Sequence, residues 1–402
     1  MRVVHLIQGV HRISAGPTPF IGRLVEEQRR AQLHSQIHAI GPAPGQWPYD
    51  APLEVHGGAF ANRFGVARSF VTATRKALHT ADVVHGHGLW RLSNLFPLFQ
   101  STPTAKLVCS PHGMLSGWSL RHRRWRKAPF WHLAQAPALA RIDLFHATAE
   151  SEYLDIRRLG FTQPIVLLPI GIDVPAHRAM AGREQQAGRA GHVNSTSNVL
   201  FLGRIHPVKG IDVLLRAWQP LEALHPGWTL TLAGPGEASH LRDAKALAGS
   251  LGLRRCAFVG EVTGDAKAAL FAQARYLVLP SRSENFAVVV AEALACALPV
   301  IASTATPWHE LPARGCGWFV PPDVSPLRDA LRQALCMPDA MHQQMGARGR
   351  AWMQQDYSWP VIAERMSLAY SWLRSGGLAP AEVRVDEAAA ALRQPNQPTV
   401  TP

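Results

Sequence analysis

The chain has 402 residues, of which 47% are hydrophobic and 17% charged, with a formal net charge of +13. This length allows two or three ordinary domains, and the composition is that of a globular rather than a disordered protein. A membrane-spanning helix is excluded, because no run of roughly eighteen apolar residues is free of a charge or a helix breaker.

Charge and cysteine usage narrow the cellular setting. Residues 1–178 hold 20 Lys and Arg against 10 Asp and Glu, whereas residues 179–402 hold 21 against 18. A basic half can attract nucleic acid, an anionic membrane surface or phosphorylated ligands, and charge alone does not choose among these. Five scattered cysteines without a Cys-x-x-Cys pair favour a reducing compartment over a disulfide framework or a zinc site. We therefore expect a cytoplasmic protein.

Short apolar runs alternate with segments of helical period, which is the pattern of a parallel sheet wrapped by helices. The predicted elements of the first half are strands at 3–7, 36–40, 82–85, 107–110, 144–147 and 166–169, and helices at 22–33, 66–78, 118–139 and 150–159. The first strand begins too close to the start of the chain, and is followed too soon by polar residues, for a signal peptide. The predicted strands of the second half are 199–202, 229–233, 257–259, 276–279, 300–302 and 318–320.

This rhythm predicts an α/β protein with two Rossmann-like, doubly wound parallel-sheet domains. The predicted parts are an N-terminal domain at 1–178, a linker at 179–197, a C-terminal domain at 198–356, a helix at 357–374 that packs back toward the N-terminal domain, and a poorly ordered tail at 375–402. Such domains bind ligands at the carboxyl ends of their strands, so we expect the two to face each other across a ligand-binding cleft.

Two carboxylates mark the loop and helix after the strand at 276–279. Glu284 is expected in the loop at the carboxyl end of the strand, and Glu292 about two turns on in a helix that opens near Ala287. Unpaired amides at the start of this helix can hold a phosphate or a hydroxyl, and carboxylates suit sugar and ribose hydroxyls. An ordinary surface glutamate followed by a helix-capping one would have the same spacing.

A glycine and two cations follow the strand at 199–202. Gly203 lets the backbone approach a ligand, and Arg204 and Lys209 can both face one point because a proline and Gly210 shape the loop. Paired Arg and Lys side chains would stabilise the negative charge of a departing diphosphate. Alone, this segment would be read as an ordinary basic loop.

Together these segments resemble the family-four retaining glycosyltransferases, which share the two-domain GT-B fold. The resemblance covers nearly the whole chain to about residue 374 and rests on Gly203-Arg204 with Lys209-Gly210, Leu232-Ala-Gly234-Pro-Gly236, Phe258-Val-Gly260, and Glu284 with Glu292-Ala, in that order. It implies a nucleotide-diphosphate-sugar donor as co-substrate, with no other cofactor.

The resemblance also implies roles for individual residues. Arg204 and Lys209 would bind the donor diphosphate, Glu292 the ribose and Glu284 the transferred sugar. Gly203, Gly234 and the backbone of Asn285, Phe286 and Ala287 would line the donor site. The family usually has glycine where Ala287 stands, so a methyl group there would narrow the donor pocket.

The first half holds candidate histidines and one candidate glycine. His112 follows the strand at 107–110, and the matching family histidine lies near the donor sugar, although a lone histidine is more often structural. His85 and His87 are weaker candidates, for the acceptor side of the site. We expect them to alternate along an extended strand and point to opposite faces, which would make them a poor metal-binding pair. Gly16 matches the family's glycine-bearing loop after the first strand. No metal site is expected.

The segment 118–131 packs five cations and three tryptophans into fourteen residues. It suits an interfacial helix on an anionic membrane, a lipid-diphosphate acceptor or nucleic acid; a solvated basic helix with its tryptophans in the core fits equally well. Ser110-Pro-His112-Gly-Met-Leu, this segment and 146–152 resemble bacterial family members that build exopolysaccharide, capsule or lipopolysaccharide. This favours a glycan or lipid-linked acceptor, and possible peripheral contact with the inner face of the cytoplasmic membrane.

The sequence contains no Asp-x-Asp, no phosphate loop of the Gly-Lys-Ser/Thr type and no His-Glu-x-x-His. We therefore predict a retaining, metal-independent glycosyltransferase that serves bacterial surface polysaccharide biosynthesis and does not bind nucleic acid. The alternatives are a nucleotide-sugar epimerase or phosphorylase with the same fold, a basic nucleic-acid-binding protein and a catalytically silent scaffold.

Overall fold

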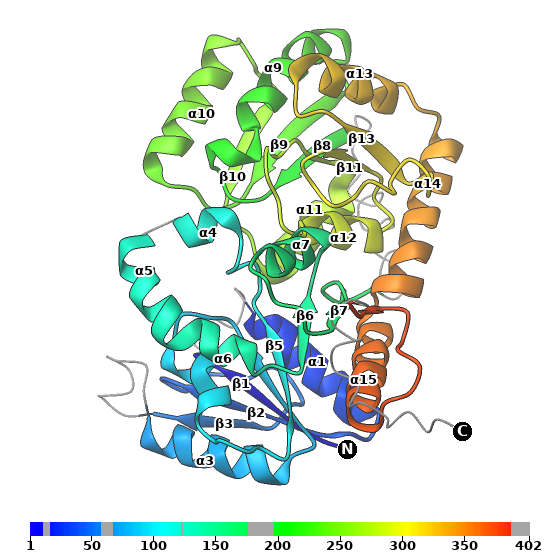
Figure 1. Ribbon diagram of the computed structural model, residues 1–402. Helices are drawn as coiled ribbons and strands as arrows, with labels where there is room; N and C mark the ends of the chain where they lie inside the picture. Colours follow the sequence, from blue (N-terminus) through cyan, green and yellow to red (C-terminus); the bar gives the residue numbers. More distant parts are fainter. Residues whose placement is uncertain (11–16, 58–66, 122–123, 176–196, 387–402) are drawn as a thin grey trace, which may run out of the picture. The chain divides into compact units, whose positions relative to one another are not determined.

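A computed structural model describes residues 1–10, 17–57, 67–121, 124–175 and 197–386 (Figure 1). The chain divides into two compact units, the first made of residues 1–171 and 359–402 and the second of residues 172–358. The expected boundary at residue 178 thus lies a few residues earlier. Of the predicted linker 179–197, only Ser197 is among the described residues. Within the described residues, no helix is both long and apolar enough to cross a bilayer.

Among the described residues of the first unit, eight strands form one sheet in the order β14-β7-β6-β5-β4-β1-β2-β3. All neighbouring strands are parallel except β14, which pairs antiparallel with β7. The strands are β1 (Arg2–Ile7), β2 (His34–Ile40), β3 (Leu53–His56), β4 (Val83–His87), β5 (Lys106–Ser110), β6 (Leu144–Ala147), β7 (Ile165–Leu167) and β14 (Val383–Arg384). The predicted tail at 375–402 is therefore wrong in its first part, because β14 belongs to the sheet.

Helices cover both faces of this sheet. They are α1 (Thr18–Arg30), α3 (Arg68–Thr80), η1 (Leu92–Leu98), α4 (Gly117–Arg121), α5 (Arg124–Phe130), η2 (Trp131–Gln135), α6 (Ala136–Ala140), α7 (Glu150–Arg158) and α15 (Trp359–Ser375). The single helix predicted at 118–139 is instead a series of short pieces, with Pro129 inside α5 and Pro137 in the first turn of α6. Proline lacks the amide that continues a helix, which explains the interruptions.

The two faces of the first sheet carry separate apolar cores. Alternate residues of a strand point to opposite faces. Val3 and Ile7 therefore pack under α1 and α15, whereas Val4 and Leu6 pack on the other face with Phe70 of α3. Helix α15 comes from the end of the chain but lies against α1 in the first unit (Figure 1).

The second unit contains, in its described residues, a six-stranded all-parallel sheet in the order β10-β9-β8-β11-β12-β13. The strands are β8 (Ser197–Leu202), β9 (Trp228–Ala233), β10 (Cys256–Gly260), β11 (Ala274–Leu279), β12 (Val300–Ser303) and β13 (Gly317–Val320). The helices are η3 (Pro207–Lys209), α9 (Ile211–Leu224), α10 (Ala238–Ser250), α11 (Gly264–Gln273), α12 (Val288–Ala295), α13 (Val324–Leu335), α14 (Asp339–Trp352) and η4 (Met353–Tyr357).

Both sheets have the doubly wound order, in which the chain moves outward from a central strand first to one side and then to the other. The direction switches between β1 and β4 in the first unit and between β8 and β11 in the second. Loops at the carboxyl ends of strands flanking such a switch point form the ligand sites of these folds. The prediction of two Rossmann-like domains is confirmed, and each switch point marks where its unit is expected to bind a ligand.

Candidate functional site

The loops that follow β8 and β11 touch at the switch point of the second unit. Gly210 has a φ of +66°, and a Cβ built on it would lie 2.2 Å from the carbonyl oxygen of Pro280. The amide of Arg282 donates to the carbonyl of Val208 at 2.7 Å. Glycine is required at 210 for both reasons, since an L side chain would be strained and would collide with the neighbouring loop. The close approach joins the predicted cationic loop to the predicted acidic loop.

Lys209 and Glu284 form an ion pair across these two loops, between Nζ and Oε1. The hydroxyl of Ser281 donates to the same carboxylate oxygen at 2.8 Å, and the amide of Glu284 donates to the carbonyl of Ala305 at 3.1 Å. The Lys209 and Glu284 side chains are only 16% and 11% exposed. A cation and an acid are thus held together at one point, where loops of such sheets bind ligands.

Gly203 and Gly234 bring the ends of β8 and β9 close together. The amide of Gly203 donates to the carbonyl of Ala233 at 2.9 Å, and a Cβ on Gly234 would lie 2.0 Å from the carbonyl oxygen of Gly203. Arg204 follows with an exposed side chain, which has no ion pair or hydrogen bond to any residue that the structure describes. Its guanidinium is therefore available to a ligand.

Phe286 and Ala287 shape the start of α12. Phe286 is 6% exposed and packs on Trp308, whose indole N–H donates to the Phe286 carbonyl at 2.7 Å. Its side chain therefore belongs to the core, and Asn285 beside it is exposed. Ala287 is the N-cap of α12, with φ +58° and ψ +60°. The helix opens where the sequence predicts, and the left-handed backbone explains why glycine suits position 287.

Replacing Ala287 with glycine should raise the free energy of unfolding of the second unit by about 1 kcal/mol, because an L side chain in this conformation is strained. Thermal unfolding of the variant and the parent measures the change. Ala293→Gly is the matched control, because Ala293 lies inside α12 and glycine there should destabilise the helix by a similar amount. A loss of stability in Ala287→Gly would contradict the strain.

Glu292 lies on α12 and forms an ion pair with Lys267 of α11, at 2.7 Å between Nζ and Oε1. The side chain of Lys267 is 32% exposed and that of Glu292 is 29% exposed. Of the four charged residues predicted to converge, the structure therefore brings Lys209 and Glu284 together and gives Glu292 a different cation. The sequence reasoning missed Lys267, because nothing in its helix distinguishes it from a solvated lysine.

In the first unit, His112 stands in a strained turn just beyond β5. Its φ is +53°, in a region that favours glycine, and such strain tends to persist where surrounding contacts hold it. The amide of Gly113 donates to Oε1 of Glu152 at 2.6 Å, and Oε2 of Glu152 accepts from the amide and hydroxyl of Thr148 at 2.8 Å each. Glu152 is 1% exposed, and burial raises the pKa of its carboxyl. This carboxyl group secures the turn that carries His112.

His85 and His87 lie on the same face of β4, so the prediction that they point to opposite faces is wrong. Residues two apart in a strand share a face, and their ring centroids are 4.1 Å apart. His5 pairs with His85 in the register of β1 and β4, and its ring centroid is 5.3 Å from each of the other two. All three are at most 1% exposed.

Burial keeps these imidazoles neutral. It lowers the pKa of His5 to about 4, of His146 to about 4 and of His112 to about 3. Burial, and then the neighbouring histidines, lower the pKa of His85 and His87 well below the ordinary value. The charge of a buried imidazolium would be poorly solvated, and the neutral form is therefore favoured.

Two groups in the described chain have ligand atoms close enough to hold a metal ion, His5 with His85 and His87, and His38 with Glu54 and His56. In the first group every ring nitrogen already has a hydrogen-bond partner. In the second, Nδ1 of His38 is 3.1 Å from Nε2 of His56. The first group adjoins a predicted site residue, because Nδ1 of His87 is 3.1 Å from Nε2 of His112.

Two sequence predictions fall wholly or partly outside the described residues. Gly16 is one, and the other is the basic segment 118–131, in which the side chains of six of the eight cations and tryptophans are not described. Within that segment Trp131 is partly buried and packs on Trp90 and Phe161, while Lys127 lies 4.7 Å over the ring of Trp90. Trp131 thus fits the alternative in which the tryptophans of this segment pack in the core.

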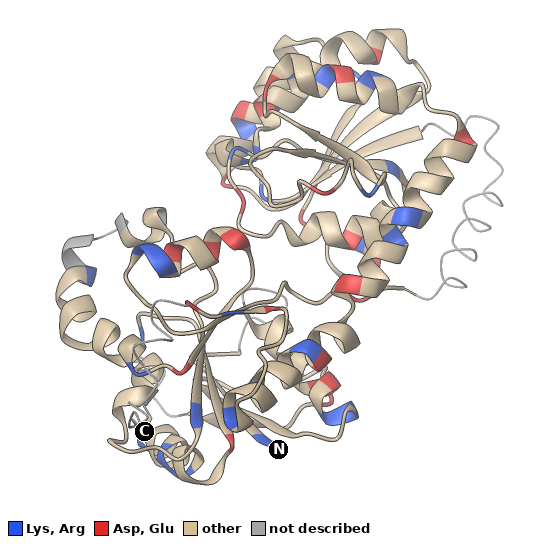
Figure 2. Ribbon diagram, turned by 45° about the vertical axis from the view of Figure 1, so that its right-hand side comes forward, with Lys and Arg blue, Asp and Glu red and all other residues tan. Residues whose placement is uncertain are grey.

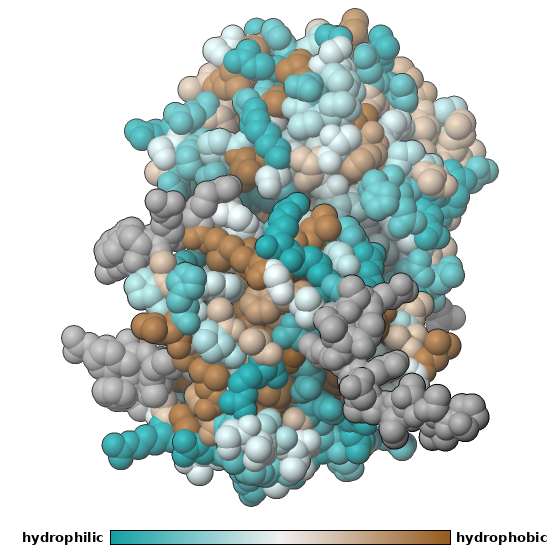
Figure 3. Space-filling view, in the orientation of Figure 1, coloured by the Kyte–Doolittle hydropathy of each residue, from teal (hydrophilic) through white to brown (hydrophobic). Residues whose placement is uncertain are grey.

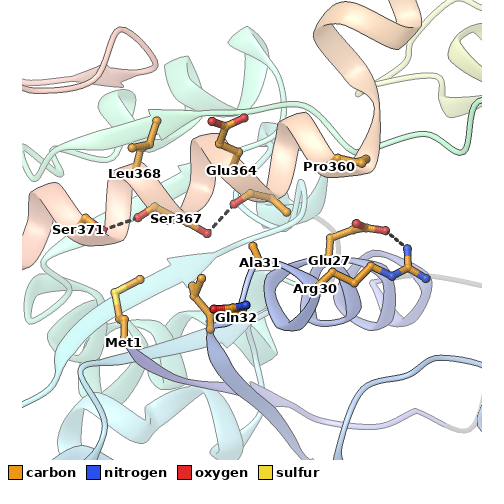
Figure 4. A pocket seen from close by; sticks show the side chains of 12 residues that line it. Met1, Glu27, Arg30, Ala31, Gln32, Pro360, Glu364, Ser367, Leu368 and Ser371 are labelled. Atoms are coloured by element: carbon orange, nitrogen blue, oxygen red, sulfur yellow. Dashed lines mark hydrogen bonds and ion pairs between the residues drawn. The ribbon is translucent and has the colours of Figure 1, made fainter.

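A groove of about 550 Å³ lies between α15 and the end of α1 (Figure 4). Met1 lines it, so it lies near the amino end of β1, away from the carboxyl ends where these folds bind ligands. Glu27 and Arg30 of α1 pair with each other beside it. The groove is therefore separate from the candidate site. Figure 2 shows acidic and basic residues interspersed in both units among the described residues.

Comparison with known proteins fits this geometry. Residues 196–336 match the family model "Glycosyl transferases group 1" and residues 15–171 match "Glycosyl transferase 4-like domain". Glycogen synthase of Mycobacterium tuberculosis is 27% identical over 303 residues, 73% of this chain and 70% of that protein. The GDP-mannose-dependent monoacylated alpha-(1-6)-phosphatidylinositol monomannoside mannosyltransferase of Corynebacterium glutamicum is 27% identical over 277 residues, 65% of this chain and 69% of that protein.

A solved structure shows the same fold. Anabaena Alr3699/HepE in complex with UDP superposes with a TM-score of 0.71 at 18% identity, over 92% of this chain and 100% of that one. The same protein has been solved with UDP-glucose. Two doubly wound sheets, the two family models and the curated relatives agree. The chain is a member of the family-four glycosyltransferases and has their GT-B architecture.

Proposed function

We propose that this glycosyltransferase moves a sugar from a nucleotide-diphosphate donor to a glycan or lipid-linked acceptor, with retention of configuration and without a metal ion or other cofactor. The observation that carries the proposal is the ion pair of Lys209 and Glu284 at the switch point of the second unit. A cation for the diphosphate and an acid for the sugar hydroxyls stand side by side there. HepE, a structural neighbour, binds UDP and UDP-glucose.

In this proposal the donor's diphosphate replaces Glu284 as the main partner of Lys209, and the exposed Arg204 adds a second positive charge. Freed from the lysine, Glu284 accepts hydrogen bonds from sugar hydroxyls, and Glu292 does the same for the ribose. The two cations stabilise the charge that develops on the diphosphate as the bond from the anomeric carbon breaks.

Retention follows when the acceptor oxygen attacks from the face that the diphosphate leaves. The bond from the anomeric carbon to the phosphate oxygen breaks through an oxocarbenium-like state, and the bond to the acceptor oxygen forms on the same side. The acceptor's proton goes to the departing phosphate oxygen. This route needs no protein nucleophile.

The acceptor is proposed to belong to bacterial surface polysaccharide, and the enzyme to work at the cytoplasmic side of the membrane. The mannosyltransferase relative acts on a phosphatidylinositol mannoside, as its name states, whereas another relative is a glycogen synthase. Leu133, next to the basic segment 118–131, is 82% exposed, and apolar surface gathers over the region of α5 and α6 in Figure 3. Such a surface suits peripheral contact with lipid.

A thermal-shift screen against nucleotide-sugars should identify the donor, because a ligand at 100 times its dissociation constant adds about 2.7 kcal/mol of stability. With that donor and lipid-linked or glycan acceptors, NMR of the product should show the anomeric configuration of the donor, with transfer unchanged by EDTA. An inverted product or a loss of activity with EDTA would refute the mechanism. Turnover without any acceptor would indicate an epimerase or phosphorylase, and glycogen as the best acceptor would refute the surface-polysaccharide role.

A further inference from the structure

A chain of buried hydrogen bonds leads from His112 into the core of the first unit. Nε2 of His112 is 3.1 Å from Nδ1 of His87, Nε2 of His87 is 3.0 Å from Nδ1 of His5, and Nε2 of His5 is 3.1 Å from Oε1 of Gln28. His5 and Gln28 are fully buried and His87 is 1% exposed. Strand register brings His5 and His87 together on β1 and β4, and α1 supplies Gln28.

Oε1 of Gln28 faces His5, while Nε2 of the same amide is buried without a hydrogen-bond partner among the described residues, and this orientation of the amide sets the direction of every bond in the chain. A neutral imidazole carries one N–H and one lone pair. The amide oxygen of Gln28 can only accept, so Nε2 of His5 donates and Nδ1 of His5 accepts. Nε2 of His87 must then donate and its Nδ1 accept, so that Nε2 of His112 donates inward.

The outer nitrogen of His112 is left with a lone pair. Its Nδ1 has no hydrogen bond to any residue within the described part of the chain. A lone pair attracts a group that carries a hydrogen, such as a sugar hydroxyl, and repels the oxygen of a phosphate, which carries none at neutral pH. The direction of the buried chain therefore decides what His112 can bind.

We propose that His87, His5 and Gln28 are positioning residues that hold His112 in the tautomer protonated at Nε2, which makes Nδ1 an acceptor for a hydroxyl of the donor sugar. The role of the hydroxyl rests on the proposed function, whereas the tautomer does not. The preference of His112 for a sugar hydroxyl over a phosphate oxygen then originates in the buried core, at Gln28, rather than at His112 itself.

A second chain on the same face provides a matched control. His146 donates from Nε2 to the carbonyl of Leu168 at 2.9 Å, and its Nδ1 is 2.7 Å from the hydroxyl of Ser110. That hydroxyl is 2.7 Å from Nε2 of His85, whose Nδ1 is 2.6 Å from the Tyr370 hydroxyl. This chain is equally buried, but no bond in it involves His112.

The tautomer is measured by nitrogen-15 NMR of the histidine rings in the full-length protein, with the His112 signal identified by its loss in His112→Gln. The parent should show a protonated Nε2 and an unprotonated Nδ1. Gln28→Leu removes the terminal acceptor and should release His112 into a mixture of tautomers, while Gln28→Glu, which keeps an accepting oxygen, should restore the parent signal. Ser110→Ala breaks only the second chain and should leave His112 unchanged.

Activity provides the second readout once the donor is known. Gln28→Leu should lower kcat about tenfold, as expected for one lost hydrogen bond, with Gln28→Glu close to the parent. A parent His112 protonated at Nδ1, or a tautomer that Gln28→Leu does not change, would overturn the proposal even if the enzyme transfers sugar. A confirmed tautomer in a protein that transfers no sugar would instead refute the proposed function alone.

Discussion

Lys209→Ala should lower turnover by roughly 10²–10³-fold, which is the usual cost of removing one group that stabilises developing charge in a transition state. Lys209 is held at the switch point by Glu284 and by the left-handed turn at Gly210, so its ammonium would need little reorganisation to bind the diphosphate of the proposed donor. Arg204→Ala should have an effect of the same order. The loss should appear mainly in kcat, because the charge is greatest as the bond breaks.

The control for this prediction is Arg328→Ala, which removes a partly exposed cation of the same unit whose neighbours are Ser325 and Asp329 on its own helix. Its turnover should match that of the parent. Circular dichroism and thermal unfolding of each variant show whether the fold is kept. Near-normal turnover in both Lys209→Ala and Arg204→Ala would contradict the assigned roles.

The strands of both sheets were largely predictable because buried parallel strands form short, nearly continuous apolar runs. Leu144–Ala147 matches β6 in full, and the restart of the pattern near residue 199 marks the second unit. β3 and β14 are not predicted. β3 lies at an edge of the sheet and alternates apolar and polar residues, and β14 has only two residues, so neither gives such a run.

The candidate site was predictable only where it is local in sequence. Glu284 lies in the loop after β11, and Lys209 lies in the segment after the neighbouring central strand β8, so topology alone brings them to one switch point. Lys267 and the buried partners of His112 were missed because their contacts depend on how separate strands and helices align. His5 meets His87 only through the register of β1 and β4, which no pattern within either strand reveals.

The first unit should lose stability steeply in mild acid. In the unfolded chain His5, His85, His87 and His146 take up protons near pH 6.5, whereas burial lowers their pKa in the folded protein, to about 4 for His5 and His146. Between these values the unfolded state binds more protons, so the free energy of unfolding falls as pH falls. Each group contributes at most about 1.4 kcal/mol per pH unit.

The four histidines are all at most 1% exposed. Well below pH 6.5 they would together lower the free energy of unfolding by up to about 5 kcal/mol for each pH unit of acidification. A domain is typically stable by only about 5–15 kcal/mol, so the sheet of the first unit should open between pH 6 and pH 4, roughly where folded and unfolded proton affinities differ most. Glu152 opposes this trend, because its raised pKa adds stability on acidification, but it is a single group.

Hydrogen exchange of β1 and β4 at a series of pH values, corrected for the intrinsic exchange rate, measures this stability in the first unit separately from the second. His146→Phe removes one of the four groups and should make the dependence on pH shallower by about one proton, whatever its effect on stability at pH 7. Exposed His34 is the matched control, and His34→Phe should leave the slope unchanged. Equal stability of β1 and β4 at pH 7 and pH 5 would mean that these histidines are not buried in their neutral form, and the direction of the hydrogen bonds reaching His112 would lose its basis.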